Sequence, residues 1–323
     1  MTESSLLIGD IGGTNARFAL ADRNVPGYSD LTTLQCADYA TADAAIKAYL
    51  ESVGAPSPEI ICLAVAGPVI DQTVQFTNNP WRISSKDLAA EFAIPAVSLL
   101  NDFAAIAHAI PYLSLDAGLL DKEQYTVGIV GPGTGLGTAG LRKQGGVFIP
   151  ISAEAGHAGF APETELQLEI LSALHQKFDR VSVESLVSGP GLENIYWALG
   201  QKRWPDSEQL SAAEIFAAAG NAGSDHAVEA VQLFFEILGQ FAGDLALMFG
   251  AEDGVFIAGG IVHRYPELFA ASRFRAGFEN KGSYRSLMEH IPTQLIMHPQ
   301  PGLLGASYVA LELFRGTEVM PTS

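Results

Sequence analysis

Two glycine-rich turns, each set between apolar segments, constrain the fold of this chain more than any other feature. The first, GDIGGTNAR (9–17), joins the strand-like runs at 5–10 and 16–22. The second, GPGTGLGTAG (131–140), follows the apolar run that starts at Tyr125. In both halves a third strand-like run and then helical patterns follow the turn. The two patterns lie about 120 residues apart and predict an internal duplication.

The remaining periodicities predict strands that alternate with helices. An amphipathic helix is expected from Ala42 to about Val53, with Thr41 as its N-cap and Gly54 as its stop signal. The other predicted elements are strands at 31–36, 59–67, 96–100, 254–260 and 293–298, a helix opened by Ser84 or Ser85, and helices at 163–178, 190–199, 211–219, 226–249 and 303–314. This alternation predicts an α/β fold with helices packed on sheets.

Length and charge narrow the class of protein. A chain of 323 residues is longer than one compact core usually organises, so two domains are expected. Acidic residues outnumber basic ones 36 to 18, and the resulting charge of −18 disfavours nucleic acid and anionic membranes as partners. Only Cys36 and Cys62 are present, which favours a reducing compartment and argues against a zinc site. With no secretory signal in the first residues, a cytoplasmic protein is expected.

The first glycine turn has the composition of a phosphate-binding turn. Gly12 and Gly13 let backbone N–H groups approach a ligand closely, and Thr14 and Asn15 add short polar side chains. Asp10, at the end of the first strand, could hold a metal ion through water. A glycine-containing hairpin turn without a ligand is the alternative, although Asp-x-Gly-Gly-Thr-Asn is richer than a hairpin needs.

The second turn contains a formal match to the dinucleotide-binding fingerprint, Gly135-x-Gly137-x-x-Gly140. That fingerprint should follow a strand and open a helix, whereas the residues after this turn read as two further strands. The phosphate loop GxxxxGK[ST] does not occur in the sequence. Two strand–turn–strand phosphate sites are therefore the better interpretation.

Asn101-Asp102 stands where an apolar strand changes directly into a predicted helix. Either residue could cap the helix by accepting hydrogen bonds from its first N–H groups. A catalytic carboxylate is also expected at the carboxyl end of a strand, where open α/β sheets bind ligands. The local sequence leaves both interpretations open.

Two further polar motifs could bind a hydroxylated ligand. EAGH places Glu154 and His157 three residues apart with small residues between them, and VES places Glu184 before a helical segment. Taken singly, these residues are also explained as a solvated charge, a core histidine and a helix-start carboxylate. Asn78, in the segment TNNPW, could line a site or form a turn before proline.

Seven motifs in order give the chain a resemblance to the bacterial glucokinases, which belong with actin, hexokinases and heat-shock ATPases. They are GDIGGTNARFAL, LLNDFAAIAHAIP, GPGTGLGTA, EAGHAGFAP, RVSVESLVSGPGLENIY, GVFIAGGIV and PGLLGA. The resemblance implies a two-domain actin/hexokinase-like α/β fold with a duplicated β-β-β-α-β-α-β-α core and a cleft between the domains. It implies glycolytic transfer of phosphate from ATP to the 6-hydroxyl of glucose. Another hexose or an N-acetylated hexose is the alternative substrate, and a chaperone-type ATPase on the same fold is the alternative class.

The resemblance also implies roles for individual residues. Asp102 would be the general base, and the sugar would contact Asn101, Asp102, Glu154, His157 and Glu184. Mg²⁺ would bridge the phosphates, with Asp10 reached through water. The ATP-binding residues would be Gly9, Asp10, Ile11, Gly12, Gly13, Thr14, Asn15, Gly133, Thr134, Gly135, Gly259 and Gly260.

The expected domains are 1–110, with a C-terminal helix at about 303–323 packed back on it, and 111–302. No cysteine cluster follows EAGH, so the structural zinc of some related sugar kinases is not expected. Symmetric dimers are the commonest assembly of soluble enzymes, which makes a homodimer the default expectation.

Overall fold

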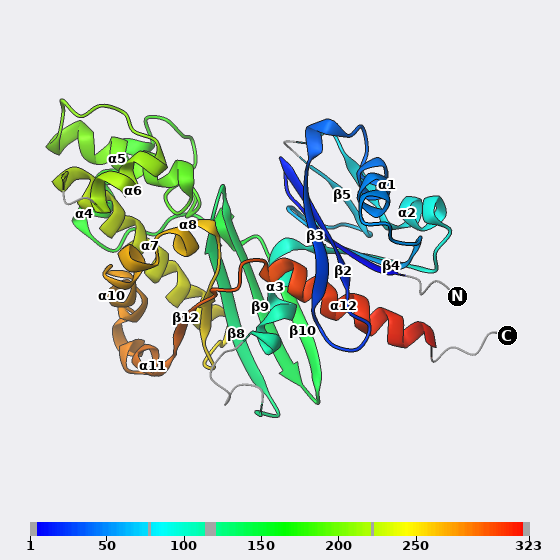
Figure 1. The fold of residues 1–323 in the computed structure, drawn as a ribbon. Coiled ribbons are helices and arrows are strands. Elements are labelled where there is room, and N and C mark those ends of the chain that lie inside the picture. The colour runs from blue at the N-terminus through cyan, green and yellow to red at the C-terminus, as the bar shows by residue number, and fades with distance from the viewer. Residues whose placement is uncertain (1–4, 77–78, 114–120, 221–222, 319–323) are drawn as a thin grey trace. The chain divides into compact units, whose positions relative to one another are not determined.

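The computed structural model describes residues 5–76, 79–113, 121–220, 223–318. The chain forms two compact units. Unit 1 comprises Met1–Lys122 and His298–Ser323, and unit 2 comprises Glu123–Met297. Each unit is built on one five-stranded sheet, and the elements can be followed in Figure 1.

The sheet of unit 1 has the strand order β3-β2-β1-β4-β7. Its strands are β1 (Ser5–Ile11), β2 (Asn15–Ala21), β3 (Tyr28–Gln35), β4 (Pro58–Val65) and β7 (Ala96–Asn101). The first three strands are antiparallel neighbours, whereas β4 and β7 continue the sheet in parallel from β1. A small hairpin of β5 (Thr73–Gln75) and β6 (Arg82–Ser84) precedes α2.

Helices cover both faces of this sheet. Successive side chains of β1 point to opposite faces, and the apolar ones on each face pack against helices. Leu7 and Ile11 pack in the cluster that contains residues of α1, whereas Leu6 and Ile8 pack with Leu303 of α12. The unit 1 helices are α1 (Ala42–Ser52), α2 (Ser85–Phe92), α3 (Asp102–Ala109) and α12 (Pro301–Glu318), with short 3₁₀ turns η1 (Cys36–Asp38) and η2 (Ile110–Tyr112).

Unit 2 repeats the same topology with the order β10-β9-β8-β11-β12. Its strands are β8 (Tyr125–Pro132), β9 (Leu136–Gln144), β10 (Val147–Ala153), β11 (Val255–Ile257) and β12 (Thr293–Leu295). Again the first three strands are antiparallel and the last two are parallel to β8. The predicted α/β fold and its duplicated core are thereby confirmed.

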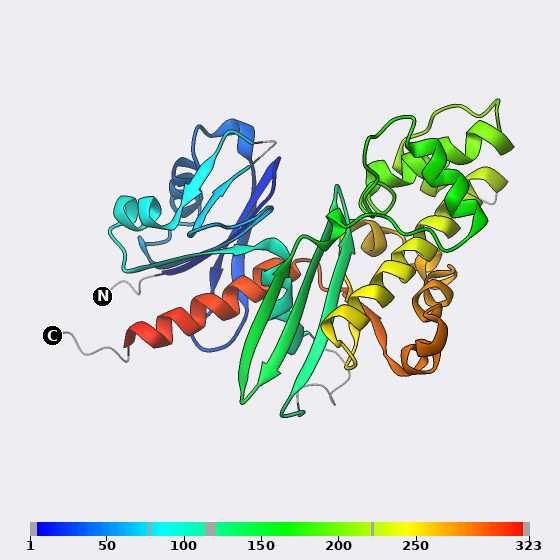
Figure 2. The same ribbon diagram turned by 180° about the vertical axis from the view of Figure 1, so that it is seen from behind.

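The helices of unit 2 pack around α7 (Asp225–Phe249), most of whose residues are buried. The others are η3 (Ala155–His157), α4 (Glu165–Leu174), α5 (Gly189–Arg203), α6 (Ala212–Gly220), α8 (Gly260–Arg264), α9 (Pro266–Ala270), α10 (Phe274–Glu279), η4 (Gly282–Tyr284) and α11 (Arg285–His290). In the part of the chain that the structure describes, α7 alone is long and apolar enough to span a membrane, and 72% of its most apolar window is buried. Figure 2 shows α7 in yellow against the green sheet, as expected for a core helix.

Several helix ends are formed as the sequence predicts. The Thr41 side chain accepts a hydrogen bond from Ala44 N–H at the start of α1, and Ser84 caps α2 through Asp87 N–H.

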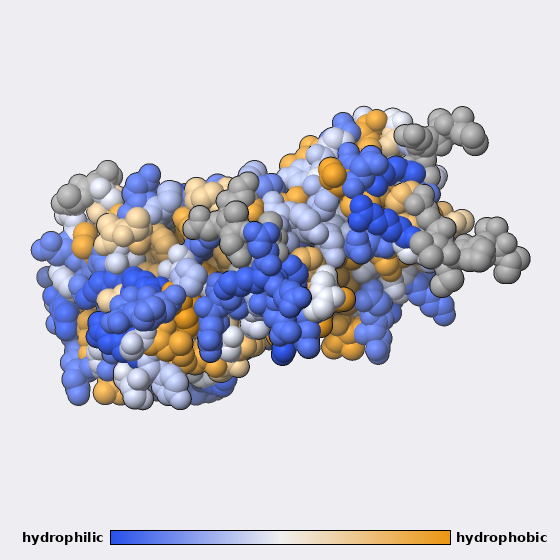
Figure 3. All heavy atoms as spheres, turned by 90° about the horizontal axis from the view of Figure 1, so that it is seen from below, coloured by the Kyte–Doolittle hydropathy of each residue, from blue (hydrophilic) through white to orange (hydrophobic). Residues whose placement is uncertain are grey.

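On the face shown in Figure 3, hydrophilic side chains are mixed with smaller apolar areas. Such a mixture is ordinary for a folded surface.

Candidate active site

The first glycine turn lies between β1 and β2 in unit 1. Gly12 N–H donates to Asn15 carbonyl oxygen at 2.9 Å, which closes the turn. Cys36 also stabilises the turn, because its N–H donates to Thr14 carbonyl oxygen at 2.8 Å. A Cβ on Gly9 would lie 2.8 Å from Leu63, so Gly9 allows the strand to pack, whereas a Cβ on Gly12 would meet nothing closer than 3.8 Å. Gly12 faces open space, as close approach of a ligand requires.

Asp10 lies opposite Arg17 across β1 and β2. The Arg17 guanidinium is 3.4 Å from Asp10 Oδ2, and the Asp10 side chain keeps 26% of its surface exposed. Burial raises the pKa of Asp10, and the charge of Arg17 partly offsets that shift. A Cβ on Gly302 would lie 3.9 Å from Asp10 Cγ, which places the first turn of α12 beside this carboxylate.

The structure assigns different positions to Asn101 and Asp102. Asn101 is the N-cap of α3, and its Oδ1 accepts from Phe103 N–H at 3.0 Å and Ala104 N–H at 3.2 Å. Its amide Nδ2 donates to Gly67 carbonyl oxygen at 3.3 Å. Asp102 is the first helical residue, and its Oδ1 accepts from Phe103 N–H at 2.9 Å. Asn101 is therefore the N-cap that binds two N–H groups, and the Asp102 carboxylate shares one of them, Phe103 N–H.

The second glycine turn connects β8 and β9 in unit 2, an antiparallel pair. The GxGxxG match thus stands in a strand–turn–strand context, as the sequence indicated. Gly133 N–H donates to Gly135 carbonyl oxygen at 2.7 Å, and Gly189 N–H donates to Gly133 carbonyl oxygen at 2.8 Å. The Thr134 side chain is exposed at the tip.

Gly259 and Gly260 lie beside this second turn. Gly259 has φ +95°, and a Cβ there would lie 2.4 Å from Pro132 carbonyl oxygen at the end of β8. Only glycine combines that backbone conformation with so close an approach. At Gly260 a Cβ would meet nothing within 4 Å. Gly259 therefore allows close packing against β8, and Gly260 leaves open space beside the turn.

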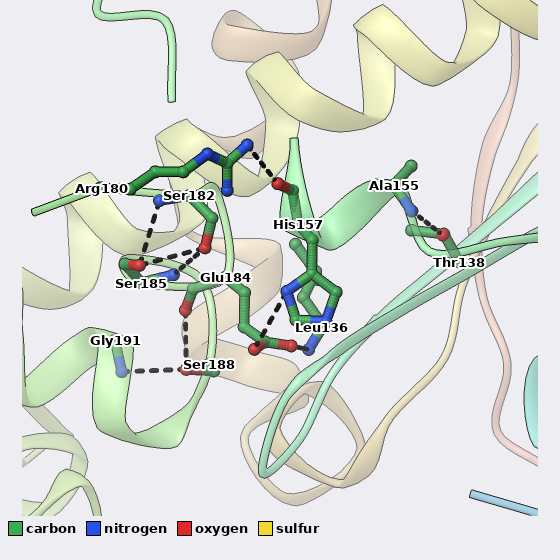
Figure 4. Close-up of polar contacts among 10 residues, drawn as sticks. All are labelled: Leu136, Thr138, Ala155, His157, Arg180, Ser182, Glu184, Ser185, Ser188 and Gly191. Atoms are coloured by element: carbon green, nitrogen blue, oxygen red, sulfur yellow. Dashed lines mark hydrogen bonds and ion pairs between the residues drawn. The ribbon is translucent and has the colours of Figure 1, made fainter. Parts of the chain in front are cut away.

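The EAGH segment follows β10 and is anchored to β9. Thr138 Oγ1 donates to Ala153 carbonyl oxygen at 2.8 Å. The same oxygen accepts from Ala155 N–H at 3.1 Å (Figure 4). A Cβ on Gly156 would lie 2.3 Å from Leu136 carbonyl oxygen, so the small residue lets the segment pack against β9. Glu154 and His157 are both exposed. His157 is therefore not the buried core histidine that was an alternative interpretation.

Glu184 connects the EAGH segment with the second glycine turn. Its Oε2 accepts from Leu136 N–H at 2.8 Å, and its Oε1 lies 3.8 Å from His157 Nδ1 (Figure 4). The residue precedes α5, whose N-cap is Ser188, so its interpretation as a helix-start carboxylate is wrong.

The structure thus groups the predicted residues by unit. Unit 1 carries Gly9 to Asn15, Asn101 and Asp102, and unit 2 carries Gly133 to Gly135, Glu154, His157, Glu184, Gly259 and Gly260. Asn78 lies outside the described residues. Within those residues no group of three or more His, Cys, Asp or Glu side chains could hold a metal ion. Sequence reasoning missed Arg17 as the partner of Asp10, although it belongs to the same motif and the strand register places it there.

Known glucokinases resemble this chain in sequence and in structure. A family model described as Glucokinase matches residues 7–313. A glucokinase from Caulobacter sp. (strain K31) is 41% identical over 308 residues, which is 93% of each chain. The crystal structure of a glucokinase from an Antarctic psychrotroph superposes with a TM-score of 0.83 at 32% identity, covering 96% of this chain and 99% of that one. A ROK family glucokinase from Streptomyces griseus in complex with glucose and AMPPNP shares the fold, with a TM-score of 0.66 and 22% identity over 96% of this chain and all of that one.

Proposed function

The chain belongs to the glucokinase family, and from this premise we propose that Asp102 is the general base in ATP-dependent phosphorylation of the glucose 6-hydroxyl. The observation that carries the assignment is that Asn101 and Asp102 make different hydrogen bonds at the start of α3. Asn101 Oδ1 accepts from both Phe103 and Ala104 N–H, and Asp102 shares the Phe103 N–H, so the cap would persist if the carboxylate took up a proton. A base at this position would take the hydroxyl proton as the oxygen attacks the terminal phosphorus.

The proposed sugar ligands are the polar groups of the EAGH and VES motifs together with Asn101. A hexose is uncharged and densely hydroxylated, and carboxylates can each accept two hydrogen bonds from it. Glu154 and His157 are exposed, and Glu184 is 31% exposed on its side chain, so all three are accessible to a sugar. Asn101 retains one amide hydrogen beyond the one given to Gly67.

The two glycine turns are the proposed holders of the ATP phosphates, with Gly259 and Gly260 next to the adenosine. Open space at Gly12, Gly133 and Gly260 supports this role, because a phosphate must approach the backbone of the turn closely. Mg²⁺ usually keeps several waters and takes one or two carboxylates plus phosphate oxygens. A single partly exposed carboxylate, Asp10, fits that requirement, and the ion would neutralise charge on the transferred phosphoryl group.

The proposal also places the protein in the cytoplasm as a homodimer that supplies phosphorylated glucose to glycolysis. Its two cysteines, both free and buried, support a reducing compartment. Size-exclusion chromatography with light scattering measures the assembly directly.

A coupled assay of ADP release from purified protein tests the activity. Glucose is compared with mannose, fructose, N-acetylglucosamine and a control without sugar. The proposal expects the highest kcat/KM with glucose and little hydrolysis without sugar. A higher kcat/KM for an N-acetylated hexose would contradict the substrate assignment, and sugar-independent hydrolysis would indicate an ATPase of another class.

A further inference from the structure

We infer that Glu184 is a positioning residue for the second glycine turn as well as a sugar ligand, so that one carboxylate couples sugar binding to nucleotide binding. The inference rests on the proposed function, which assigns the turn to ATP and Glu184 to the hexose. It goes further because it gives the two ligands a shared side chain within unit 2.

The Glu184 carboxylate is in direct contact with the turn. Its Oε2 accepts the N–H of Leu136, the first residue after Gly135, at 2.8 Å. A Cβ on Gly135 would lie 2.5 Å from the same oxygen, so the carboxylate occupies the space where any other residue would place its side chain. Any other residue at position 135 would therefore displace the Glu184 carboxylate, and Gly135 has no positive φ that would explain the glycine otherwise.

The backbone around Glu184 is fixed on both sides. Glu184 N–H donates to Gly156 carbonyl oxygen at 2.9 Å, and Glu184 carbonyl oxygen accepts from Ser188 Oγ at 2.9 Å. Ser188 Oγ also accepts from Gly191 N–H at 3.0 Å as the cap of α5, and the next residue, Gly189, donates to Gly133 carbonyl oxygen. The segment from Glu184 to Gly189 therefore holds the turn at both ends, by a side chain at Leu136 and by a backbone amide at Gly133.

The second carboxylate oxygen faces the sugar side. Oε1 lies 3.8 Å from His157 Nδ1, and the His157 side chain is 62% exposed (Figure 4). A sugar hydroxyl that donates to Oε1 would hold the carboxylate in the orientation that binds Leu136 N–H. Bound glucose should consequently order the turn before ATP arrives, and bound nucleotide should favour glucose by the same factor.

Calorimetry with AMPPNP alone and with glucose alone separates the two roles. Glu184→Ala removes both contacts and is expected to weaken binding of each ligand by roughly tenfold or more. Glu184→Gln keeps an oxygen that can accept from Leu136 N–H, so nucleotide affinity should stay within about threefold while glucose binding weakens. His157→Ala is the matched control, because it alters the sugar side without touching the turn, and its nucleotide affinity should equal that of the wild type.

A double-mutant cycle distinguishes positioning from general destabilisation. Gly135→Ala should weaken binding of both ligands in the wild-type background, because the new methyl group displaces the carboxylate. In the Glu184→Ala background that methyl group enters vacated space, and the same change should have little further effect. Additive losses, or an unchanged nucleotide affinity in Glu184→Ala, would overturn the inference. Failure of the wild type to phosphorylate glucose would instead refute the proposed function, and the nucleotide titrations remain informative in that case.

Discussion

Units 1 and 2 contain the same five-stranded sheet in the same order, but the residues that flank their glycine turns differ in chemistry. The difference lies in the second-to-last residue pair of the two strands that lead to each turn. In unit 1 this pair on β1 and β2 is Asp10 and Arg17, whereas in unit 2 the pair on β8 and β9 is Gly131 and Gly137. The strands therefore place a carboxylate and a guanidinium before the first turn and two glycines before the second. The duplication has preserved the path of the chain while the charged groups have diverged, so each turn should fail in a different way when altered.

The residues that support the turns from neighbouring segments differ in the opposite sense. In unit 1, Cys36 contacts the turn through its N–H to Thr14 and through its thiol, 3.7 Å from Gly12 carbonyl oxygen. In unit 2 the corresponding support is the charged Glu184. Cys36 is neutral and does not contact a proposed sugar ligand through its charge. The Glu184 carboxylate contacts both the turn and His157, so a sugar that binds it can affect the turn. Coupling between ligands is thus expected through the second turn.

The fifth strands end differently too. β7 of unit 1 leads into Asn101 and Asp102, while β12 of unit 2 is followed by Ile296 and Met297. Of these two equivalent strand ends, the one in unit 1 carries a carboxylate, as the proposed general base requires.

The largest expected effect is that of Asp102→Asn. The amide keeps the size of the side chain and can still accept from Phe103 N–H, but it cannot take up the hydroxyl proton. We expect kcat to fall by about 10² to 10⁴ while glucose affinity measured by calorimetry stays within a few-fold. Asp43→Asn, which alters another carboxylate in the first turn of a unit 1 helix, is the control and should leave kcat unchanged. Turnover of Asp102→Asn within about threefold of wild type would refute the base assignment.

Matched substitutions in the two turns come next. A Cβ at Gly12 or at Gly133 would meet only one backbone oxygen, no closer than 3.8 Å, so neither Gly12→Ala nor Gly133→Ala should disturb folding. If phosphates approach the turns over these glycines, the added methyl group should hold them away and raise the Kd for AMPPNP by roughly ten- to a hundredfold.

Thermal unfolding and glucose titration are the controls for this pair, and both should match the wild type. A normal nucleotide affinity in one variant alone would mean that only the other turn binds phosphate. Gly13→Val, with a branched side chain at the next position of the first turn, should have a larger effect of the same kind.

The sequence predicted the elements that have strong local signals. The glycine turns, the alternating strands around them and the caps Thr41 and Ser84 each depend on residues close in the chain, and the structure confirms them. The short helices between 260 and 290 were not predicted, because five or six residues give too little helical periodicity to detect. The bond from Leu136 N–H to Glu184 spans 48 residues and uses a backbone amide, which any residue but proline offers. No pattern in one sequence could identify it.

A buried histidine in each unit gives a smaller effect, on stability. Burial lowers the pKa of His226 in unit 2, and it lowers the pKa of His108 in unit 1 to about 4. The unfolded chain thus binds a proton at about pH 6.5 that folded His108 accepts only near pH 4, so stability falls as the pH drops through this window. Between pH 7 and pH 5, His108 should account for a loss of about 2 kcal/mol in the free energy of unfolding.

His108→Phe isolates this contribution, because it retains a ring against Tyr308 and removes the Nδ1 that is buried without a partner. In urea unfolding at pH 7 and pH 5 the variant should lose less stability on acidification than the wild type. His175→Phe, at an exposed position, is the control and should behave as the wild type. Equal acid sensitivity of His108→Phe and the wild type would show that unit 1 does not keep this residue neutral.

The smallest effect expected is that of Asp10→Asn on magnesium, and it bears on the difference between the turns most directly. If Asp10 contacts the ion through water, the change removes one outer-shell hydrogen bond with a net contribution of about 0.5–1.5 kcal/mol. The Mg²⁺ concentration for half-maximal turnover should rise about two- to tenfold, while the affinity for metal-free nucleotide stays nearly constant. Asp87→Asn changes an exposed carboxylate of the same unit, paired with Arg82, and should leave the magnesium requirement unaltered. An unaltered requirement in Asp10→Asn as well would mean that the carboxylate serves only its pair with Arg17. Phosphate oxygens and water alone would then bind the metal. The Asp10–Arg17 pair would have only a structural role beside the first turn, at the position where Gly131 and Gly137 lie beside the second.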